Sequence, residues 1–386
     1  MKESYIEINV KNLQHNFKWY QSQSLNKFQC PMIKANAYGV GLDLVFSALK
    51  SLKPSAYGVV RLSEALSIRK KDNDVKILMF NPCDQDDYNV LIDQNITPVI
   101  SSFESALILE KALKNKRINQ FEVHIEVDTG MNRLGFRIHE LDQLFAFITN
   151  NSSIIISGVF SHFLKADDWP EKSGRCFAQL TMFEEVVKIF DTLNKNHSES
   201  ISKKGLDFHL SSSKAFNDSG LSSEYNDRLK SFGLRPGLGL YGISQNNKNL
   251  KPVLSLKSPI VSLKWIPKGE SVSYDGVWVA DKKSLIGVLP IGYGDGYPRS
   301  LTGKTYVLIH GQKIPVVGLI CMDFLMIDCT SVQDKVKIDD LAVVFGQESN
   351  RLSLSIEDLS DKAGMITYEF ITGLSARLKR VAVETN

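Results

Sequence analysis

Short runs of apolar, β-branched residues alternate with longer amphipathic segments along the first 240 residues of the chain. Segments 103–113 and 176–193 carry apolar residues at three- and four-residue spacing, which is typical of amphipathic helices. Strands that alternate with helices in this way indicate a parallel α/β architecture. Eight repeats favour a closed TIM (β/α)8 barrel over an open, doubly wound sheet. The predicted strands are 30–34, 56–60, 75–79, 97–100, 121–127, 154–160, 206–210 and 232–235.

The pattern changes after Tyr241 and Gly242, where short strands follow one another with little helical periodicity until about Ile356. We therefore predict two domains, an α/β barrel over residues 1–244 and a mainly β domain over residues 245–386. The strands predicted in the second domain are 252–261, 277–279, 284–291, 305–309, 313–320, 325–328 and 341–345.

Composition narrows the class of partner. The 386 residues suffice for about two domains. The 46 lysines and arginines nearly balance the 43 aspartates and glutamates, so no charge field indicates nucleic acid or an anionic membrane. A small-molecule partner is favoured instead.

The amino terminus and the cysteines indicate a cytoplasmic protein. Residues 1–8 alternate charged and apolar side chains without the apolar core of a signal peptide, and no apolar run is long enough to span a bilayer. Five cysteines, odd in number and widely spaced, are typical of reduced thiols. No metal-ligand spacing appears, so we expect no metal site.

Several polar candidates follow predicted barrel strands. Active sites of such barrels lie at the carboxyl ends of the strands, so we expect these side chains to meet at one rim. The loops after the last two strands, which often bind phosphate in these barrels, contain Ser213 and the small residues of segment 237–239. The rim candidates are Lys34, Arg133, His162, His209 and Arg235.

Lys34 lies in the octapeptide MIKANAYG, residues 32–39, at the end of an apolar run. Partial loss of hydration there lowers the pKa of a lysine and makes its neutral, nucleophilic amine more available. A surface lysine that caps a strand is the alternative interpretation of this segment.

The octapeptide resembles the cofactor-lysine signature of alanine racemases, which use pyridoxal 5'-phosphate (PLP). Four later motifs resemble those of the same family in the same order: VDTGMNRLG at 127–135, RPG at 235–237, GYGDGYPR at 292–299 and CMD at 321–323. Together they span nearly the whole chain. The resemblance implies a PLP-dependent isomerase that interconverts L- and D-alanine and supplies D-alanine for peptidoglycan.

The resemblance also implies the catalytic residues. Lys34 would carry PLP and move the α-proton on one face of the substrate, and Tyr274 of a partner subunit would act on the other face. His162 and Arg235 would stabilise the tyrosine anion, and Arg235 would also contact the cofactor ring nitrogen. Homodimerisation is then required. Considered without the family, Tyr274 fits a turn beside Asp275, His162 a structural histidine and Arg235 a strand-end ion pair.

Further roles follow from the resemblance, residue by residue. Arg133 and Met322 would hold the substrate carboxylate, while Tyr293 and Arg299 would line the entrance, with Glu126 and Asp323 in support. The amino-terminal segment 5–8 would pair with the β domain. For the tyrosines and Met322, ordinary packing is the alternative. The implied cofactor-binding residues are Lys34, Tyr38, His209, Ser213, Arg235, Gly237, Leu238 and Tyr368.

Three positions depart from the family pattern. Glu126 stands where several members carry a carbamylated lysine, seven residues before Arg133. We expect its carboxylate to orient Arg133 without carbon dioxide. Val40 replaces a usual histidine, and Ser212 replaces a usual asparagine, which bears on the side chain that the pocket accepts.

Three other functions are consistent with parts of this pattern. A serine or broad-specificity racemase of the same fold differs by pocket contacts worth only about 1–3 kcal/mol. A fold-related PLP decarboxylase would carry a carboxylate at the ring nitrogen, where Arg235 argues against it. A non-catalytic PLP carrier would consist of the barrel alone, without Tyr274 and the second domain.

Overall fold

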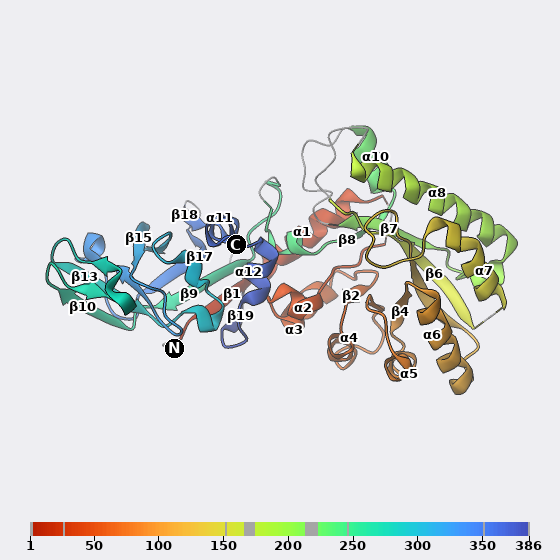
Figure 1. Cartoon of the computed structure of the whole chain (residues 1–386), viewed down its shortest axis with the longest axis horizontal. Helices are drawn as coiled ribbons and strands as arrows, with labels where there is room; N and C mark the ends of the chain where they lie inside the picture. The colour runs from red at the N-terminus through yellow and green to blue at the C-terminus, as the bar shows by residue number, and fades with distance from the viewer. Residues whose placement is uncertain are drawn as a thin grey trace.

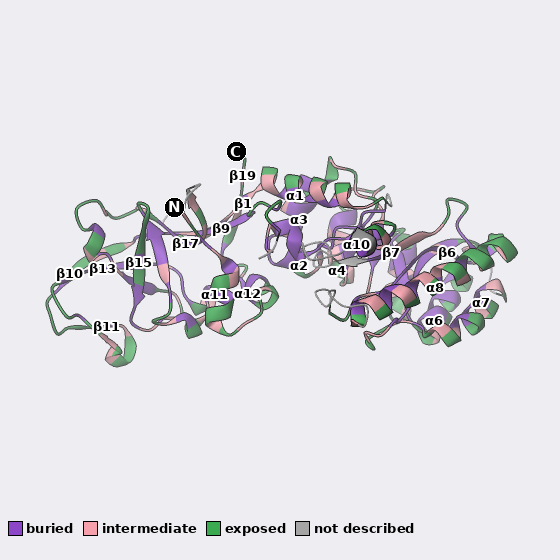
Figure 2. Cartoon of the chain, turned by 90° about the horizontal axis from the view of Figure 1, so that it is seen from above, coloured by how far each residue is buried: buried purple, intermediate pink, exposed green. Residues whose placement is uncertain are grey.

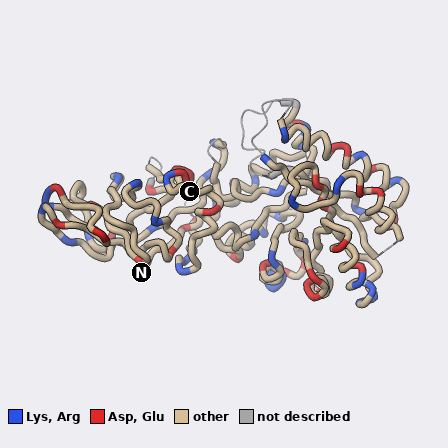
Figure 3. The backbone as a smooth tube through the Cα atoms, in the orientation of Figure 1, with Lys and Arg blue, Asp and Glu red and all other residues tan. Residues whose placement is uncertain are grey.

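The structure is a computed structural model that describes residues 3–25, 28–150, 153–165, 174–212, 223–244, 247–349 and 352–384. The chain is elongated, with the helix-rich barrel at one end and a β-rich part at the other, and both termini lie by the β-rich part (Figure 1). Basic and acidic residues are interspersed along the chain in both parts (Figure 3). No helix among the described residues has the length and apolar character needed to cross a bilayer.

Seven parallel strands form the barrel wall in the order in which they occur along the chain. Each is short and mostly buried on both faces, as parallel strands covered by helices are. The strands are β2 (Tyr57–Val59), β3 (Ile77–Met79), β4 (Thr97–Ile100), β5 (Phe121–Glu126), β6 (Ile154–Phe160), β7 (Asp207–Ser212) and β8 (Gly233–Arg235).

The segment 28–33 closes the gap between β8 and β2. Cys30 N donates to Leu234 O at 2.8 Å, and Ile33 N donates to Gly58 O at 2.9 Å. The predicted first strand is therefore reduced to two isolated bridges, at Gln29 and Met32, and Lys34 lies beyond it. Pro31, which has no backbone N–H, interrupts regular pairing between the two bridges. The predicted barrel followed by a mainly β domain is otherwise confirmed.

Helices surround the barrel and bury one face against it (Figure 2). The predicted helices 103–113 and 176–193 are present and slightly longer, as α6 and α8. Helix α6 begins after Ser102, whose side chain accepts from Ser105 N as an N-cap. The helices are α1 (Val10–Gln23), α3 (Leu42–Lys50), α4 (Leu62–Arg69), α5 (Gln85–Asp93), α6 (Phe103–Lys116), α7 (Leu141–Asn150), α8 (Arg175–Asn196) and α10 (Ser223–Lys230).

A ten-stranded sheet organises the β-rich part and includes both ends of the chain. Strand β1 (Tyr5–Asn9) pairs in parallel with β19 (Lys379–Val383) and antiparallel with β9 (Leu254–Pro259). Its other strands are β10 (Ser262–Ile266), β13 (Ser284–Leu289), β14 (Tyr306–Ile309), β15 (Gln312–Val317), β16 (Leu325–Asp328), β17 (Leu341–Ser349) and β18 (Leu352–Leu354). A separate hairpin pairs β11 (Ser271–Val272) with β12 (Trp278–Val279), and helices α11 (Ile356–Ala363) and α12 (Thr367–Gly373) follow β18.

The sequence prediction missed β10, β11, β18 and β19. Strands β10 and β19 are at the two ends of the sheet order, and they bury few of their side chains. An edge strand has no second neighbour, so its sequence lacks the apolar alternation that the prediction requires.

Candidate active site

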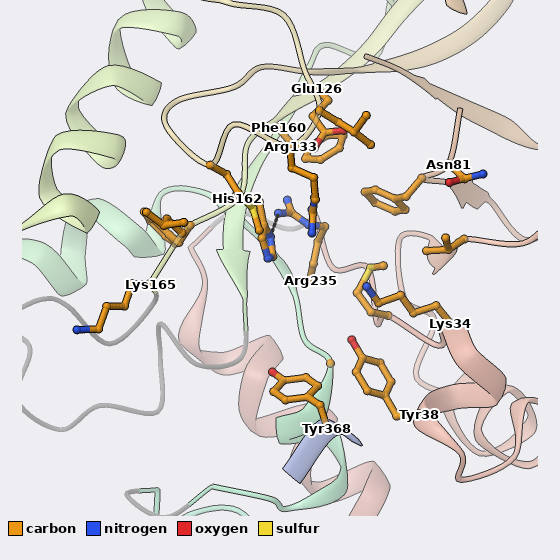
Figure 4. A pocket seen from close by; sticks show the side chains of 18 residues that line it. Lys34, Tyr38, Asn81, Glu126, Arg133, Phe160, His162, Lys165, Arg235 and Tyr368 are labelled. Atoms are coloured by element: carbon orange, nitrogen blue, oxygen red, sulfur yellow. Dashed lines mark hydrogen bonds between the residues drawn. The ribbon is translucent and has the colours of Figure 1, made fainter. Parts of the chain in front are cut away.

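A cavity of about 560 Å³ lies at the carboxyl ends of the barrel strands (Figure 4). Residues that are far apart in sequence meet there, as predicted from their positions after the barrel strands. Glu126 and Phe160 lie on one side, and Tyr38 and Tyr368 lie on the other. Predicted site residues that line the cavity are Lys34, Tyr38, Glu126, Arg133, His162, Arg235, Gly237 and Tyr368.

Lys34 begins a left-handed turn, α2 (Lys34–Tyr38). The four residues from Ala35 to Tyr38 have φ values of 52°, 54°, 53° and 57°, although none of them is glycine. Each left-handed L-residue costs roughly 1–2 kcal/mol, so surrounding contacts must maintain the turn. Asn36 supplies one, because its Oδ1 accepts from Leu42 N at 2.8 Å.

Electrostatics favour the neutral form of the Lys34 amine. Burial lowers the pKa of Lys34, and the positive charges of Arg133 and Arg235 lower it further. A neutral amine is the nucleophilic form that attacks a carbonyl carbon.

Arg235 lies at the end of β8 and is 5% exposed. Its Nη1 donates to His209 O at 2.7 Å, and its Nη2 donates to Ser161 O at 2.7 Å. Nη2 also lies 3.4 Å from His162 Nδ1 (Figure 4), and the guanidinium lies 4.8 Å from the centroid of Phe160. Arg235 forms no ion pair with a carboxylate among the described residues, and burial lowers its pKa to about 10. The predicted alternative of a surface ion pair is therefore wrong.

His162 is the histidine beside this guanidinium that lines the cavity. Loss of hydration, followed by the charges of Arg235, Arg133 and Lys34, lowers the pKa of His162 to about 3. The ring is neutral at physiological pH, so it has one N–H donor and one acceptor nitrogen.

Tyr38 and Gly237 form a tight contact on the other side of the cavity. A Cβ atom built on Gly237 would lie 2.5 Å from the Tyr38 hydroxyl oxygen, so only glycine fits beneath that hydroxyl. The rings of Tyr38 and Tyr368 are 6.0 Å apart, and burial raises the pKa of both phenols. Two neutral hydroxyl donors therefore lie beside a glycine that lines the cavity, an arrangement that suits an anion such as a phosphate.

Comparison with known proteins identifies the family. The profile described as "Alanine racemase, N-terminal domain" matches residues 8–245, and "Alanine racemase, C-terminal domain" matches residues 253–382. This chain belongs to the alanine racemase family.

Individual alanine racemases match over nearly their whole length. The alanine racemase of Clostridium novyi is 35% identical over 393 residues, which cover 100% of this chain and 96% of that protein. That of Halothermothrix orenii is 33% identical over 388 residues, covering 98% and 96%. The two domains therefore occur together in these relatives, in the same order.

Solved alanine racemase structures share the fold. The structure from Clostridium difficile 630 matches with a TM-score of 0.85 at 28% identity, covering 99% of this chain and 96% of that one. A Bartonella henselae alanine racemase "with covalently bound pyridoxal phosphate" matches with a TM-score of 0.82 at 25% identity, covering 99% of both chains.

Glu126 departs from the alanine racemase pattern and is 5% exposed. Burial raises the pKa of its carboxyl, while the charges of Arg133 and Arg235 lower it. Glu126 and Arg133 both line the cavity without a direct ion pair between them. Arg133 therefore acts on Glu126 through its charge rather than through a hydrogen bond.

A second group of alanine racemase positions lies on the β-rich part and not in this cavity. Tyr274, Met322 and Tyr293 are 70%, 52% and 43% exposed. Tyr274 follows β11 in a 3-10 turn with Asp275 at φ 60° and borders a shallow apolar hollow with Cys321 and Phe324. Arg299 and Asp323 are on the same part, and Asp323 pairs with Arg377 at 2.7 Å.

Of the other predicted cofactor residues, two are buried away from the cavity and one is not described by the structure. Leu238 is buried at the start of a 3-10 turn and, like the fully buried His209, does not line the cavity. Ser213 lies outside the described residues. The sequence reasoning missed Phe160, which lies beneath Arg235, and His124, which contacts His209. Both residues could have been found from the pattern of β5 and β6, two buried strands whose side chains alternate toward the barrel interior.

Proposed function

We propose that this protein interconverts L- and D-alanine with PLP bound covalently to Lys34, and that it supplies D-alanine for peptidoglycan. One observation carries the proposal: a lysine with a lowered pKa shares a cavity with a buried arginine that has no carboxylate partner among the described residues. Membership of the alanine racemase family supports it.

The cavity residues fit this cofactor. Tyr38, Tyr368 and the Gly237 backbone would hold the phosphate, and Arg235 would face the ring nitrogen, as the family resemblance implies. PLP, when bound, supplies an electron sink for the carbanion that forms when the α-proton leaves. Arg235 cannot give up its proton at working pH, so it would leave the ring nitrogen unprotonated. That weaker electron withdrawal would favour reprotonation over decarboxylation.

Two bases on opposite faces would move the proton. The Lys34 amine would remove or return it on one face, and the partner subunit's Tyr274 would do so on the other. The tyrosine of the same chain is 70% exposed and does not line the cavity of its own barrel, which supports a role in a second copy. Its phenol needs stabilisation as an anion to act as a base at neutral pH. His162 and Arg235 would provide it through hydrogen bonds.

The groups that would hold the substrate come from both parts of the chain. Arg133 would bind the carboxylate, with Met322 of the partner subunit beside it, and the negative charge of Glu126 would orient the guanidinium. Tyr293, Arg299 and Asp323 would form or support the entrance. The active protein would be a cytoplasmic homodimer with shared sites.

A chiral assay tests the proposal. L-Alanine is incubated with the purified protein, with and without PLP, while circular dichroism follows the optical signal. We expect a decay to zero that requires PLP and is absent in Lys34→Ala. L-Serine is assayed beside it, because faster loss of the serine signal would replace alanine as the substrate. A constant signal with every amino acid would contradict racemisation.

A further inference from the structure

Three buried polar side chains form a chain that leads inward from the cavity. Arg235 Nη1 lies 2.7 Å from His209 Nδ1, and His209 Nε2 lies 2.9 Å from His124 Nδ1. The histidines belong to β7 and β5, and each is 0% exposed. Of the three, only Arg235 lines the cavity.

The hydrogen positions in this chain follow from the donors available. A guanidinium has only donors, so His209 Nδ1 must accept and is unprotonated. The single proton of a neutral His209 then lies on Nε2 and is donated to His124 Nδ1. By the same argument, His124 carries its own proton on Nε2. Burial lowers the pKa of both rings well below the ordinary value, which keeps them neutral.

Aromatic side chains and the backbone of β6 pack closely around the two rings. Phe28 lies 4.6 Å from the His209 ring and 5.7 Å from the His124 ring, measured between centroids. Phe160 also stacks on the His209 ring, with the ring centroids 4.9 Å apart and an angle of 14° between the ring planes. A Cβ atom on Gly158 would lie 2.3 Å from His124 Cε1, so the ring lies directly on the backbone of β6.

Packing alone does not explain a histidine at position 124. Its Nε2 is buried and has no hydrogen-bond partner among the described residues. A buried donor without a partner lowers stability, and an apolar residue of similar shape would avoid that cost. The other nitrogen, which accepts from His209, is therefore the feature that requires histidine.

We propose that His124 is a positioning residue for Arg235. By accepting at Nδ1, it fixes the proton of His209 on Nε2 and keeps His209 Nδ1 as an acceptor for the guanidinium. Without it, the buried Nε2–H of His209 loses its acceptor, which destabilises the tautomer whose Nδ1 accepts from Arg235. The consequence for catalysis rests on the proposed function, because there Arg235 contacts the cofactor.

The hydrogen positions are tested first on the wild-type protein as purified, without substrate. Nitrogen-15 NMR of histidine-labelled protein distinguishes the two tautomers, and a coupling across the N–H···N hydrogen bond identifies this pair among the seven histidines. We expect both coupled rings to carry the proton on Nε2. A proton on Nδ1 of either ring would overturn the proposal.

Three variants then test the effect on Arg235. His124→Asn keeps an acceptor oxygen near the position of Nδ1, whereas His124→Leu removes it. Leu144→Ala, at a buried position of α7, is a control that destabilises the barrel and leaves this chain of hydrogen bonds unchanged in sequence. We expect kcat for alanine to fall about ten- to a hundredfold in His124→Leu with KM changed less than about twofold, since a charge-assisted hydrogen bond is misplaced.

The outcomes separate the two proposals. We expect His124→Asn to recover most of kcat and Leu144→Ala to lower the melting temperature with kcat unchanged. Equal kcat in His124→Asn and His124→Leu, or a wild-type kcat in His124→Leu, would overturn the role of His124. Absence of racemisation in the wild type, with the expected tautomers, would contradict the proposed function and leave the hydrogen-bond assignment supported.

Discussion

Arg380 Nε donates a hydrogen bond of 3.0 Å to the carbonyl oxygen of Gly39, which joins the last strand of the sheet to the turn that follows Lys34. The same guanidinium donates to Ser375 O at 2.5 Å and to Leu374 O at 2.9 Å. Because the turn consists of left-handed residues, such contacts hold a conformation that the sequence would otherwise avoid. The carboxyl terminus of the chain therefore helps to position the candidate cofactor lysine.

Replacement of Gly39 is expected to disturb this connection. Gly39 has φ +80°, and a Cβ atom there would lie 2.4 Å from Ile371 O. Gly39→Ala should lower the free energy of unfolding by about 2 kcal/mol or more, from backbone strain together with the collision. Gly205→Ala is the matched control, because φ is +90° there but nothing lies within 4 Å. Urea unfolding of both variants would separate the effect of backbone strain from that of the collision. Equal losses of unfolding free energy in the two variants would contradict a close contact at Gly39.

Glu126 allows a test with bicarbonate. If its carboxylate orients Arg133, the wild-type racemase activity should not respond to bicarbonate, because no carbamate has to form. Glu126→Gln removes the charge and should raise KM for alanine about tenfold, the effect of about 1.4 kcal/mol. Glu126→Lys should recover activity only when bicarbonate is present. Equal KM values for Glu126→Gln and the wild type would show that the charge is unimportant.

Stability should fall as the pH is lowered below the ordinary histidine range. The folded-state pKa of His162 is about 3, whereas an unfolded histidine titrates near its ordinary value of about 6.5. As the pH falls, the unfolded state therefore binds a proton first. The free energy of unfolding then decreases by up to about 1.4 kcal/mol per pH unit between those two pKa values. His162→Gln should reduce the decline in melting temperature from pH 7 to pH 5. The exposed His139→Gln is the control, and equal slopes for the two variants would contradict this linkage.

The barrel could be predicted from sequence because its strands are buried runs between amphipathic helices. The boundaries of β4 and β6 agree with the prediction at every residue. The first strand and the edge strands of the β sheet were harder to predict, because Pro31 interrupts pairing and β19 has no fully buried side chain. The local sequence pattern does not indicate a strand such as β19, because its pairing partner β1 is distant in sequence.

The chain pattern alone predicted site residues by the rule that they follow a strand, whereas Tyr38, Glu126 and Tyr368, which also line the cavity, were predicted from the family resemblance. Lys34, His162 and Arg235 satisfy that rule. The left-handed turn after Lys34 did not appear in the prediction, because alanine and tyrosine rarely adopt positive φ and tertiary contacts impose it. His124 was missed for a similar reason, since its hydrogen bond to His209 connects strands that are 85 residues apart in sequence.

Mixing two inactive variants tests whether two subunits share each active site. Lys34→Ala removes the cofactor lysine, and Tyr274→Phe removes the second base, so each homodimer should be inactive in alanine racemisation. Unfolding the two together and refolding them as a mixture should produce hybrid dimers in which one site has both residues, with about a quarter of the wild-type activity per site if copies pair at random. Activity that reappears only in the mixture would support a site shared between subunits. A mixture as inactive as either variant alone, with hybrid dimers present, would contradict it.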